Sequence, residues 1–197
     1  FHGQVHHAMG QLEMAIREYR EAVKLAPHDV RMRLNLGSAY HNQGNLESAI
    51  AQYREAIRLN PTDHVLHYNL GLALCDQGRM ASAIAAYKES ARLNPEDALV
   101  RYALGVAQET KGNLSQAIAE YEAAIQLNPG LAIAYTKLGW ILYNLHRVPQ
   151  AAVVFEKAVK CDGDDPQALH GLGLAKLEMG KEEEAISLVV QAYQKEE

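Results

Sequence analysis

The side chains in this sequence that are best suited to hold a metal are histidines that occur in two close pairs. His2 and His6 are four residues apart, and His64 and His67 are three apart, so each pair would share one face of a helix. A zinc site needs three or four ligands, and no cysteine or carboxylate completes either pair at a suitable spacing. We interpret these histidines as surface residues and expect neither a metal nor another cofactor.

The acidic segment Asp162–Asp165 is the other group of potential ligands. A calcium loop also requires a glycine at a fixed place and a bidentate glutamate further along, and this segment has neither. We therefore expect a turn that caps a helix. The sequence also shows no nucleophile paired with a base and no glycine-rich phosphate loop after a strand. These observations argue against an enzyme.

The sequence as a whole is organised by a repeat of 34 residues. Four series of residues keep this spacing in a common phase, which chance does not explain. The glycine series is Gly3, Gly37, Gly71, Gly105, Gly139 and Gly173. The alanine series is Ala15, Ala49, Ala83, Ala117, Ala151 and Ala185. The aromatic series, which ends in a valine, is Tyr19, Tyr53, Tyr87, Tyr121, Phe155 and Val189. The proline series is Pro27, Pro61, Pro95 and Pro129.

The order Leu-Gly, Ala, aromatic and Pro resembles the tetratricopeptide repeat (TPR). One unit reads Leu36, Gly37, Tyr40, Ala49, Tyr53, Ala56 and Pro61. The resemblance covers the whole chain and implies an all-α fold, a right-handed superhelical solenoid of antiparallel helix pairs. We name the two helices of a unit helix A and helix B. We expect a single domain over residues 1–197, with a partial unit 1–29 followed by units 30–63, 64–97, 98–131, 132–165 and 166–197.

Local chemistry explains the pattern within a unit. A glycine inside a helix costs about 1 kcal/mol relative to alanine, so we expect the first glycine series to face the alanine of helix B at a close helix crossing. A second series, Gly10, Gly44, Gly78, Gly112 and Gly180, predicts the end of each helix A, where a left-handed conformation is needed. Pairs such as Asn60-Pro61 end helix B. The next helix A is then capped by an aspartate, which is Asp29, Asp63, Asp97 or Asp165.

The unit 132–165 departs from this pattern. His146 replaces the turn glycine, Gly163 replaces the terminal proline, and Pro149 falls in the first turn of helix B, where its missing amide costs little. We interpret this unit as an altered turn within a continuous stack. We also expect the aromatic residue of each helix B to fill the space between its own unit and the next.

The resemblance further implies a groove lined by positions 2, 5, 6, 9, 12 and 13 of each unit, all in helix A. The residues that we expect there are Asn35, Val65, Tyr68, Asn69, Leu72, Leu99, Tyr102, Val106, Ile133, Lys137 and Trp140. An exposed apolar and aromatic strip of this kind is typical of a binding site. The alternative is that Leu72 and Val106 only pack between neighbouring A helices. Trp140 leaves the same two options open.

Two binding modes known in the family can be compared with these positions. Members that clamp the acidic tail of a chaperone carry Lys and Asn at positions 5 and 9 of one unit, a pair that no unit has here. Members related to the arm of a nuclear sugar transferase carry a ladder of Asn at position 6, which grips the backbone of an extended peptide. Asn35 and Asn69 would supply two rungs of such a ladder.

We therefore expect a scaffold or adaptor that binds a peptide or helix of a partner protein in this groove. A second hypothesis is the substrate-recruiting arm of a larger enzyme. A third is a scaffold that self-associates through its uncapped ends, because Leu188, Val189, Val190 and Tyr193 have no following helix to cover them.

Bulk composition narrows the partners. The chain has 48% hydrophobic and 22% charged residues, and its net charge of −5 argues against nucleic acid, which requires a basic stripe. The sequence contains no run of about 18 apolar residues, so we expect no insertion into a membrane. Cys75 and Cys161 fall in different units, so we expect two reduced, part-buried thiols. The sequence opens with Phe1 inside a repeat and is interpreted as a fragment; the lack of a signal segment favours a cytoplasmic location without deciding the compartment.

Overall fold

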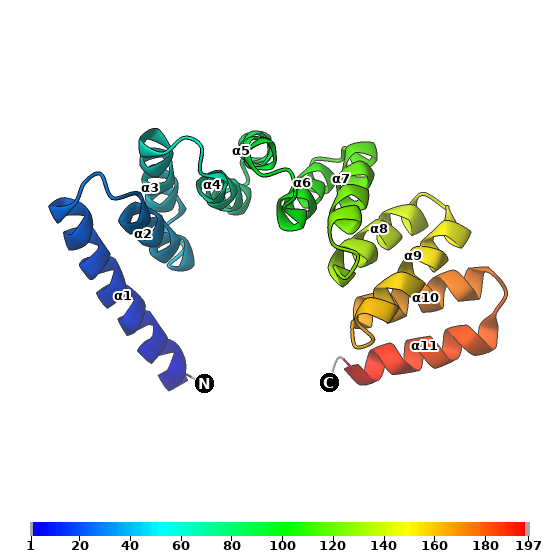
Figure 1. The fold of residues 1–197 in the computed structure, drawn as a ribbon. Coiled ribbons are helices and arrows are strands. Elements are labelled where there is room, and N and C mark those ends of the chain that lie inside the picture. The colour runs from blue at the N-terminus through cyan, green and yellow to red at the C-terminus, as the bar shows by residue number, and fades with distance from the viewer. Residues whose placement is uncertain (1, 196–197) are drawn as a thin grey trace. The chain divides into compact units, whose positions relative to one another are not determined.

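The structure is a computed structural model that describes the backbone of residues 2–195 and the side chains of residues 11–195. Over the described backbone it contains eleven helices and no strand (Figure 1). The all-α repeat fold expected from the sequence is confirmed. The helices are α1 (His2–Leu25), α2 (Val30–Asn42), α3 (Leu46–Leu59), α4 (His64–Asp76), α5 (Met80–Leu93), α6 (Ala98–Thr110), α7 (Leu114–Leu127), α8 (Ala132–Asn144), α9 (Val148–Cys161), α10 (Pro166–Glu178) and α11 (Glu182–Lys195).

The helices group into two compact units, residues 1–95 and residues 96–197. In unit 1, α2–α3 and α4–α5 form antiparallel hairpins, α1 packs on α2, and α4 packs on α3. In unit 2, the hairpins are α6–α7, α8–α9 and α10–α11, and they join through α7 against α8 and α9 against α10. Each even-numbered helix corresponds to a helix A of the repeat. A single solenoid over the whole chain remains a prediction.

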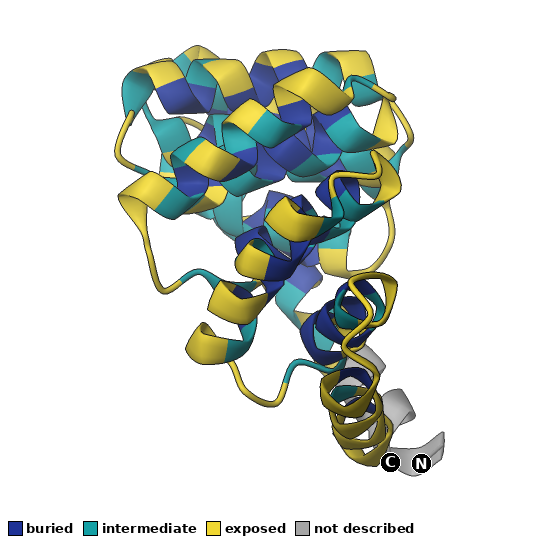
Figure 2. Ribbon diagram, turned by 90° about the vertical axis from the view of Figure 1, so that its right-hand side faces the viewer, coloured by how far each residue is buried: buried dark blue, intermediate teal, exposed yellow. Residues whose placement is uncertain are grey.

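In every described hairpin but α10–α11, where Val189 takes its place, an aromatic ring of helix B lies against a glycine of helix A. A Cβ atom added to Gly37 would come within 2.6 Å of the Tyr53 ring, and one added to Gly105 would come equally close to Tyr121. Tyr53 and Tyr121 are fully buried. Figure 2 shows buried residues on the helix faces that turn toward neighbouring helices. The aromatic ring thus occupies the space that the missing side chain leaves, and at Gly173 an added Cβ would also lie 3.3 Å from the backbone oxygen of Ala185 in helix B.

The aromatic ring also connects successive hairpins, as the sequence predicts. In unit 2, a Cβ on Gly139 of α8 would lie 2.6 Å from Phe155, and a Cβ on Gly171 of α10 would lie 2.4 Å from the same ring. Phe155 has no exposed surface. It is thus enclosed by its own hairpin and by the first helix of the next one.

The turns and caps follow the sequence pattern closely. Four turn glycines have left-handed φ angles of 75° to 82°, namely Gly44, Gly78, Gly112 and Gly180. His146, which replaces the glycine in the irregular unit, adopts φ of 56°. The four predicted aspartate caps accept hydrogen bonds from backbone amides at the start of α2, α4, α6 and α10. Pro149 lies in the first turn of α9, as expected.

The first repeat does not form the predicted hairpin. α1 runs without a break from His2 to Leu25, so the helix end expected at Gly10 is wrong. In a later unit the turn glycine is followed by Asn45, whose side chain accepts a hydrogen bond from the Ser48 amide, whereas Gln11 is a poor cap. A glycine within a helix costs only about 1 kcal/mol, which continued helical hydrogen bonding offsets. The side chains of the predicted surface pair His2 and His6 lie outside the described residues, as do the surroundings of Gly3.

Gly105→Ala tests the contact between glycine and ring. The added methyl group meets Tyr121, which is fully buried and has no room to move, so we expect a loss of about 1–3 kcal/mol despite the better helix propensity of alanine. Urea unfolding measures the change. Gly163→Ala is the matched control, because the nearest atom to its added Cβ is 3.7 Å away. Stability of Gly105→Ala equal to that of the original chain would contradict this packing argument.

His146→Gly tests the strained turn between α8 and α9. A left-handed conformation costs a residue with a side chain about 1–2 kcal/mol, and glycine gives back about 0.5–1 kcal/mol through its larger entropy loss on folding. We expect the free energy of unfolding, measured by thermal denaturation, to rise by about 0.5–1 kcal/mol. Gly112→Ala, at the equivalent turn, should lose stability by a similar amount. A lower melting temperature for His146→Gly would refute the interpretation.

Candidate peptide-binding surface

The predicted groove residues divide between the two units, and unit 2 holds the larger aromatic set. Tyr102 and Val106 of α6 and Trp140 of α8 all pack against one buried cluster that includes Tyr121 and Phe155. The Tyr102 and Tyr121 rings have centroids 5.8 Å apart, and those of Trp140 and Phe155 are 5.3 Å apart. All three predicted residues remain half-buried. They are thus held on the core while part of each side chain stays accessible.

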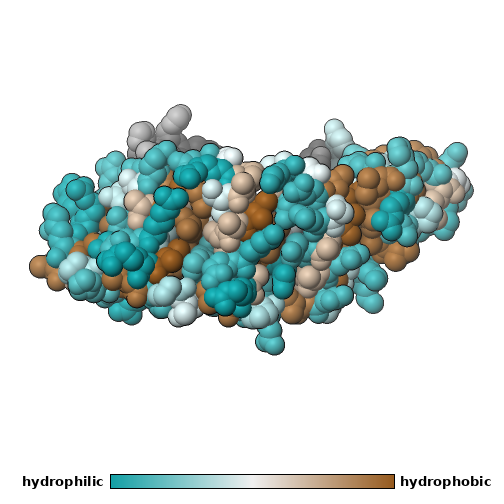
Figure 3. All heavy atoms as spheres, turned by 90° about the horizontal axis from the view of Figure 1, so that it is seen from above, coloured by the Kyte–Doolittle hydropathy of each residue, from teal (hydrophilic) through white to brown (hydrophobic). Residues whose placement is uncertain are grey.

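Two further predicted residues of unit 2 are more exposed. Leu99 is 53% exposed and Ile133 is 48% exposed. Leu99 lies one helical turn before Tyr102 on α6, and Ile133 lies one turn before Lys137 on α8. Single exposed apolar residues are normal, and Figure 3 shows hydrophobic patches interspersed with hydrophilic side chains on one face of the molecule. What distinguishes these two is that they lie on the same helices as the half-buried rings of Tyr102 and Trp140.

Trp140 is both a packing residue and an accessible one. Its ring makes edge contacts with Phe155, with Tyr143 of the same helix, and with His170 of α10. His170 is exposed and occupies position 5 of its helix, so it extends the aromatic surface of α8 onto α10. Trp140 therefore combines features of the core and of the predicted groove. Its ring contacts the buried ring of Phe155, while the residue as a whole stays partly exposed.

Two carboxylates of unit 2 are held by tyrosine hydroxyls. Tyr121 donates a hydrogen bond to Glu109 (2.6 Å), and Tyr143 donates one to Glu178 of α10. Burial, followed by the hydrogen bond to Glu109, raises the pKa of Tyr121, and the hydrogen bond to Glu178 raises the pKa of Tyr143. Both phenols therefore stay protonated and fix the carboxylates. Glu109 and Glu178 occupy positions 12 and 13 of their units, which the family pattern assigns to the groove, but they were not among the residues predicted for the site.

A cavity of about 430 Å³ lies where α8 and α10 begin. Its lining includes Ile133 and Lys137 together with the acidic segment 162–165. Asp165 caps α10 through the Gln167 amide and also accepts a hydrogen bond from Thr136 (2.8 Å). The acidic segment is a capped turn, as predicted, and it places negative charge beside Lys137.

The remaining predicted residues lie in unit 1. Asn35 is on α2, and Val65, Tyr68, Asn69 and Leu72 are on α4, which is packed near α2. Val65 is 39% exposed, and the Tyr68 ring packs on Tyr87 with centroids 5.8 Å apart. Asn69 donates its side-chain amide to the Val65 carbonyl of the same helix (2.8 Å). That donor is engaged within α4, which weakens the comparison with a ladder of peptide-gripping asparagines.

The remaining side chains that could bind a metal or react are spread over the described chain. Within the described residues, no three His, Cys, Asp or Glu side chains are placed to hold a metal ion. Cys75 is half-buried and Cys161 is exposed, and both are free thiols, so the expectation of a part-buried thiol is wrong for Cys161. Among the helices described, none is long and apolar enough to span a bilayer.

Comparison with known sequences places the repeats in a family. Models described as TPR repeat match residues 3–44 and 38–78, and models described as tetratricopeptide repeat match residues 68–132 and 110–177. The chain belongs to the tetratricopeptide repeat family. Curated protein sequences yield no significant match to it. The TPR fold is typically a non-catalytic scaffold, and the repeats of this chain support a scaffold for protein–protein interaction in general.

Solved TPR structures resemble the chain over most of its length. A crystal structure of MamA is 27% identical, with a TM-score of 0.75 over 82% of this chain and 94% of MamA. The pilF protein of Pseudomonas aeruginosa is 20% identical, with a TM-score of 0.83 over 98% of this chain and 87% of that protein. YrrB, described as a TPR protein with an unusual peptide-binding site, is 19% identical, with a TM-score of 0.72 over 90% of this chain and 91% of its own. The last two similarities concern the fold alone.

Trp140→Ala and Ile133→Ala should show which of the two side chains contributes to the stability of the fold. Trp140 is half-buried, so we expect its removal to cost about 1.5–3 kcal/mol, less than the roughly 3–5 kcal/mol typical of a fully buried aromatic residue. Ile133→Ala should change stability by no more than about 0.5 kcal/mol, as is usual at exposed sites. Chemical denaturation measures both. A large loss with Ile133→Ala would show that this side chain is structural and not available to a ligand.

Proposed function

We propose that the A-helix face of unit 2 binds a segment of a partner protein that carries apolar anchors and basic residues. The supporting observation is that Leu99 and Ile133 are about half exposed on α6 and α8, the helices that carry the half-buried rings of Tyr102 and Trp140. A ligand would bury these side chains without disturbing the core on which the rings rest. Aromatic residues held in this way are frequent binding hot spots.

Charge on the same face supports a basic ligand. Glu109 and Glu178 are fixed at one end of the A helices by tyrosine hydroxyls, and Asp162 lines the cavity at the other end, where Asp164 pairs with Lys195. Lys137 is the cation within this lining. It is suited to a backbone carbonyl or carboxylate of the ligand. Carboxylates on both sides of an apolar strip attract a segment that has apolar residues between or next to Lys and Arg.

Unit 1 offers a second surface of the same kind, formed by Asn35, Val65, Tyr68, Asn69 and Leu72. Its helix A also combines an exposed aliphatic residue with a half-buried aromatic ring. Peptide binding by a TPR chain of similar fold is described for YrrB, which supports the class of ligand but not its sequence. Recruitment of substrates to a larger enzyme stays an alternative prediction.

The test is a selection of peptides from a random display library, followed by titration of the selected peptides as synthetic ligands. Trp140 is the single tryptophan of the chain, so its emission reports binding near α8 directly. We expect selected peptides to combine apolar residues with Lys or Arg. Their affinity should weaken with salt, because surface charge pairs are screened.

Leu99→Lys and Ile133→Lys should each weaken binding at least about tenfold, equivalent to about 1.4 kcal/mol. Both sites are exposed enough to accept lysine without unfolding. Val153→Lys is the matched control, since Val153 is 52% exposed on α9 of the same unit but is outside the proposed face. Unchanged affinity in the Leu99 and Ile133 variants, with melting temperatures preserved, would refute the assignment of this face.

A further inference from the structure

In each unit, one pair of neighbouring A helices is joined by a polar bridge at the same repeat positions. In unit 1, the Nε2 atom of His41 on α2 lies 2.7 Å from a carboxylate oxygen of Asp76 on α4. In unit 2, Tyr143 of α8 donates a hydrogen bond to Glu178 of α10, and these residues occupy the repeat positions of His41 and Asp76. Because the two bridges are equivalent in the repeat, the side chains around them show what is particular to each.

Of these two bridges, the one in unit 2 has an indole ring beside it. Trp140 lies three residues before Tyr143 on α8, and the centroids of the two rings are 6.0 Å apart. In unit 1 the position equivalent to Trp140 is Ser38, which offers no ring surface. The bridge of unit 2 therefore combines an aromatic surface with a fixed carboxylate, whereas that of unit 1 has the carboxylate without the indole.

The indole ring of Trp140 makes only edge contacts with the rings described around it. Tyr143, Phe155 and His170 meet it at interplanar angles of 83°, 76° and 60°. No ring of the described chain is thus stacked parallel to the indole, and Trp140 remains partly exposed. A planar group from another molecule can take the parallel stacking geometry that these contacts leave unused.

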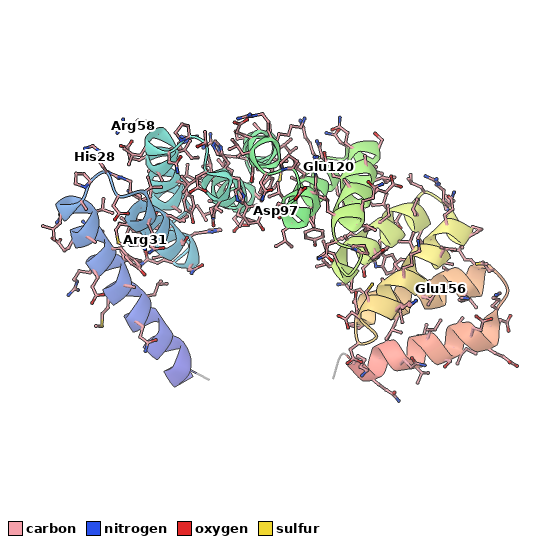
Figure 4. All side chains as sticks on the ribbon, in the orientation of Figure 1. His28, Arg31, Arg58, Asp97, Glu120 and Glu156 are labelled. Carbon is pink, nitrogen blue, oxygen red and sulfur yellow. The ribbon has the colours of Figure 1, made fainter. Side chains whose placement is uncertain are left out.

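The exposed carboxylate of Glu178 forms no ion pair with the lysines that are nearest to it in the described sequence. Lys176 pairs instead with Glu156 of α9, which Figure 4 labels, at 2.8 Å and with Glu184 of α11 at 3.0 Å. Lys181 also pairs with Glu184. The charge of Glu178 is therefore available to a cation that another molecule supplies.

The hydrogen bond from Tyr143 orients the Glu178 carboxylate and leaves it able to accept others. The hydroxyl donates to one of the two oxygens, Oε1, whereas an ionised carboxylate has about four acceptor sites. A carboxylate that is already held in place loses less conformational freedom when a ligand binds. Glu178 is therefore prepared to accept hydrogen bonds from a cation next to the Trp140 ring.

We propose that Trp140, Tyr143 and Glu178 form a site for one arginine side chain of the partner segment, with its guanidinium stacked on the indole and hydrogen-bonded to Glu178. This inference rests on the proposed A-helix face and specifies one basic residue of its ligand. Arginine fits better than lysine, because a guanidinium is planar, stacks on aromatic rings and is weakly hydrated, whereas an ammonium is compact and strongly hydrated. We name these three residues the arginine site.

The probe for this site is N-acetyl-arginine methylamide, titrated into the full chain at constant ionic strength. Trp140 is the single tryptophan of the chain, so its indole N–H gives one unambiguous signal in a proton–nitrogen NMR spectrum. We expect this signal to shift saturably at millimolar probe concentrations. The citrulline analogue keeps the planar shape without the charge and should bind at least about fivefold more weakly. The lysine analogue should bind at least about threefold more weakly than the arginine probe.

Variants of the chain locate the binding. Glu178→Gln should weaken binding of the arginine probe about two- to fivefold, because the amide oxygen still accepts the Tyr143 hydrogen bond but carries no charge. Asp76→Asn is the matched control, since it makes the same kind of change at the equivalent bridge of unit 1, next to Ser38. It should bind the probe as the original chain does, and both variants should keep the original melting temperature.

Peptides selected for the A-helix face give a second measurement of the same contact. Replacing one of their arginines by citrulline should weaken binding to the original chain about tenfold, and the same replacement should cost clearly less in the Glu178→Gln variant. Equal losses in the two chains would show that no arginine of the peptide contacts Glu178.

Three results would overturn the arginine site: an indole signal that the arginine probe leaves in place, equal affinities for the arginine and citrulline probes, or unchanged affinity in Glu178→Gln. Equal affinity for the lysine probe would overturn the assignment to arginine. The site and the proposed function can fail separately. Peptides that bind and depend on Ile133, without a shift from the arginine probe, would refute the site alone. A probe that binds as expected, without any peptide that depends on Ile133, would refute the proposed function alone.

Discussion

The contact between an aromatic ring and the bare Cα of a glycine is the constraint on which the rest of this structure depends. It brings helices A and B so close that any side chain at the glycine would overlap the ring. The contact uses the inner face of helix A for packing. Positions six residues earlier on the same helices, such as Leu99 and Ile133, lie on another side and are left accessible. Stability and the available binding surface thus arise from opposite sides of the same element.

The 34-residue period made most of the fold predictable. Helix ends, aspartate caps and left-handed turns are local features, and a local pattern suffices to place them. The failure at Gly10 has the opposite origin, because a glycine permits a turn without enforcing one. The contact of the ring with the glycine was not predicted. Periodicity shows which residues share a helix face, but it does not show that the Tyr53 ring reaches across to Gly37.

The candidate site was predictable in its positions but not in its character. The family pattern indicated where Trp140 and Ile133 lie along helix A. It could not indicate that Trp140 packs on the core and also stays partly exposed, because this depends on Phe155 and His170 from two other helices. The tyrosine–glutamate pairs were missed for a similar reason. Each joins residues from different helices, and only their relative orientation brings hydroxyl and carboxylate together.

Phe155 has a further consequence, because its ring is shared between two hairpins. In a repeat protein, the free energy of unfolding is close to a sum of terms for single repeats and for the interfaces between neighbours. Loss of α10–α11 would uncover Phe155 and so remove an interface term from α8–α9 as well. Fraying of unit 2 from its C-terminal end is therefore opposed by the exposure of this ring, together with the contacts that Ala168, Leu172 and Ala175 of α10 make in the same two clusters.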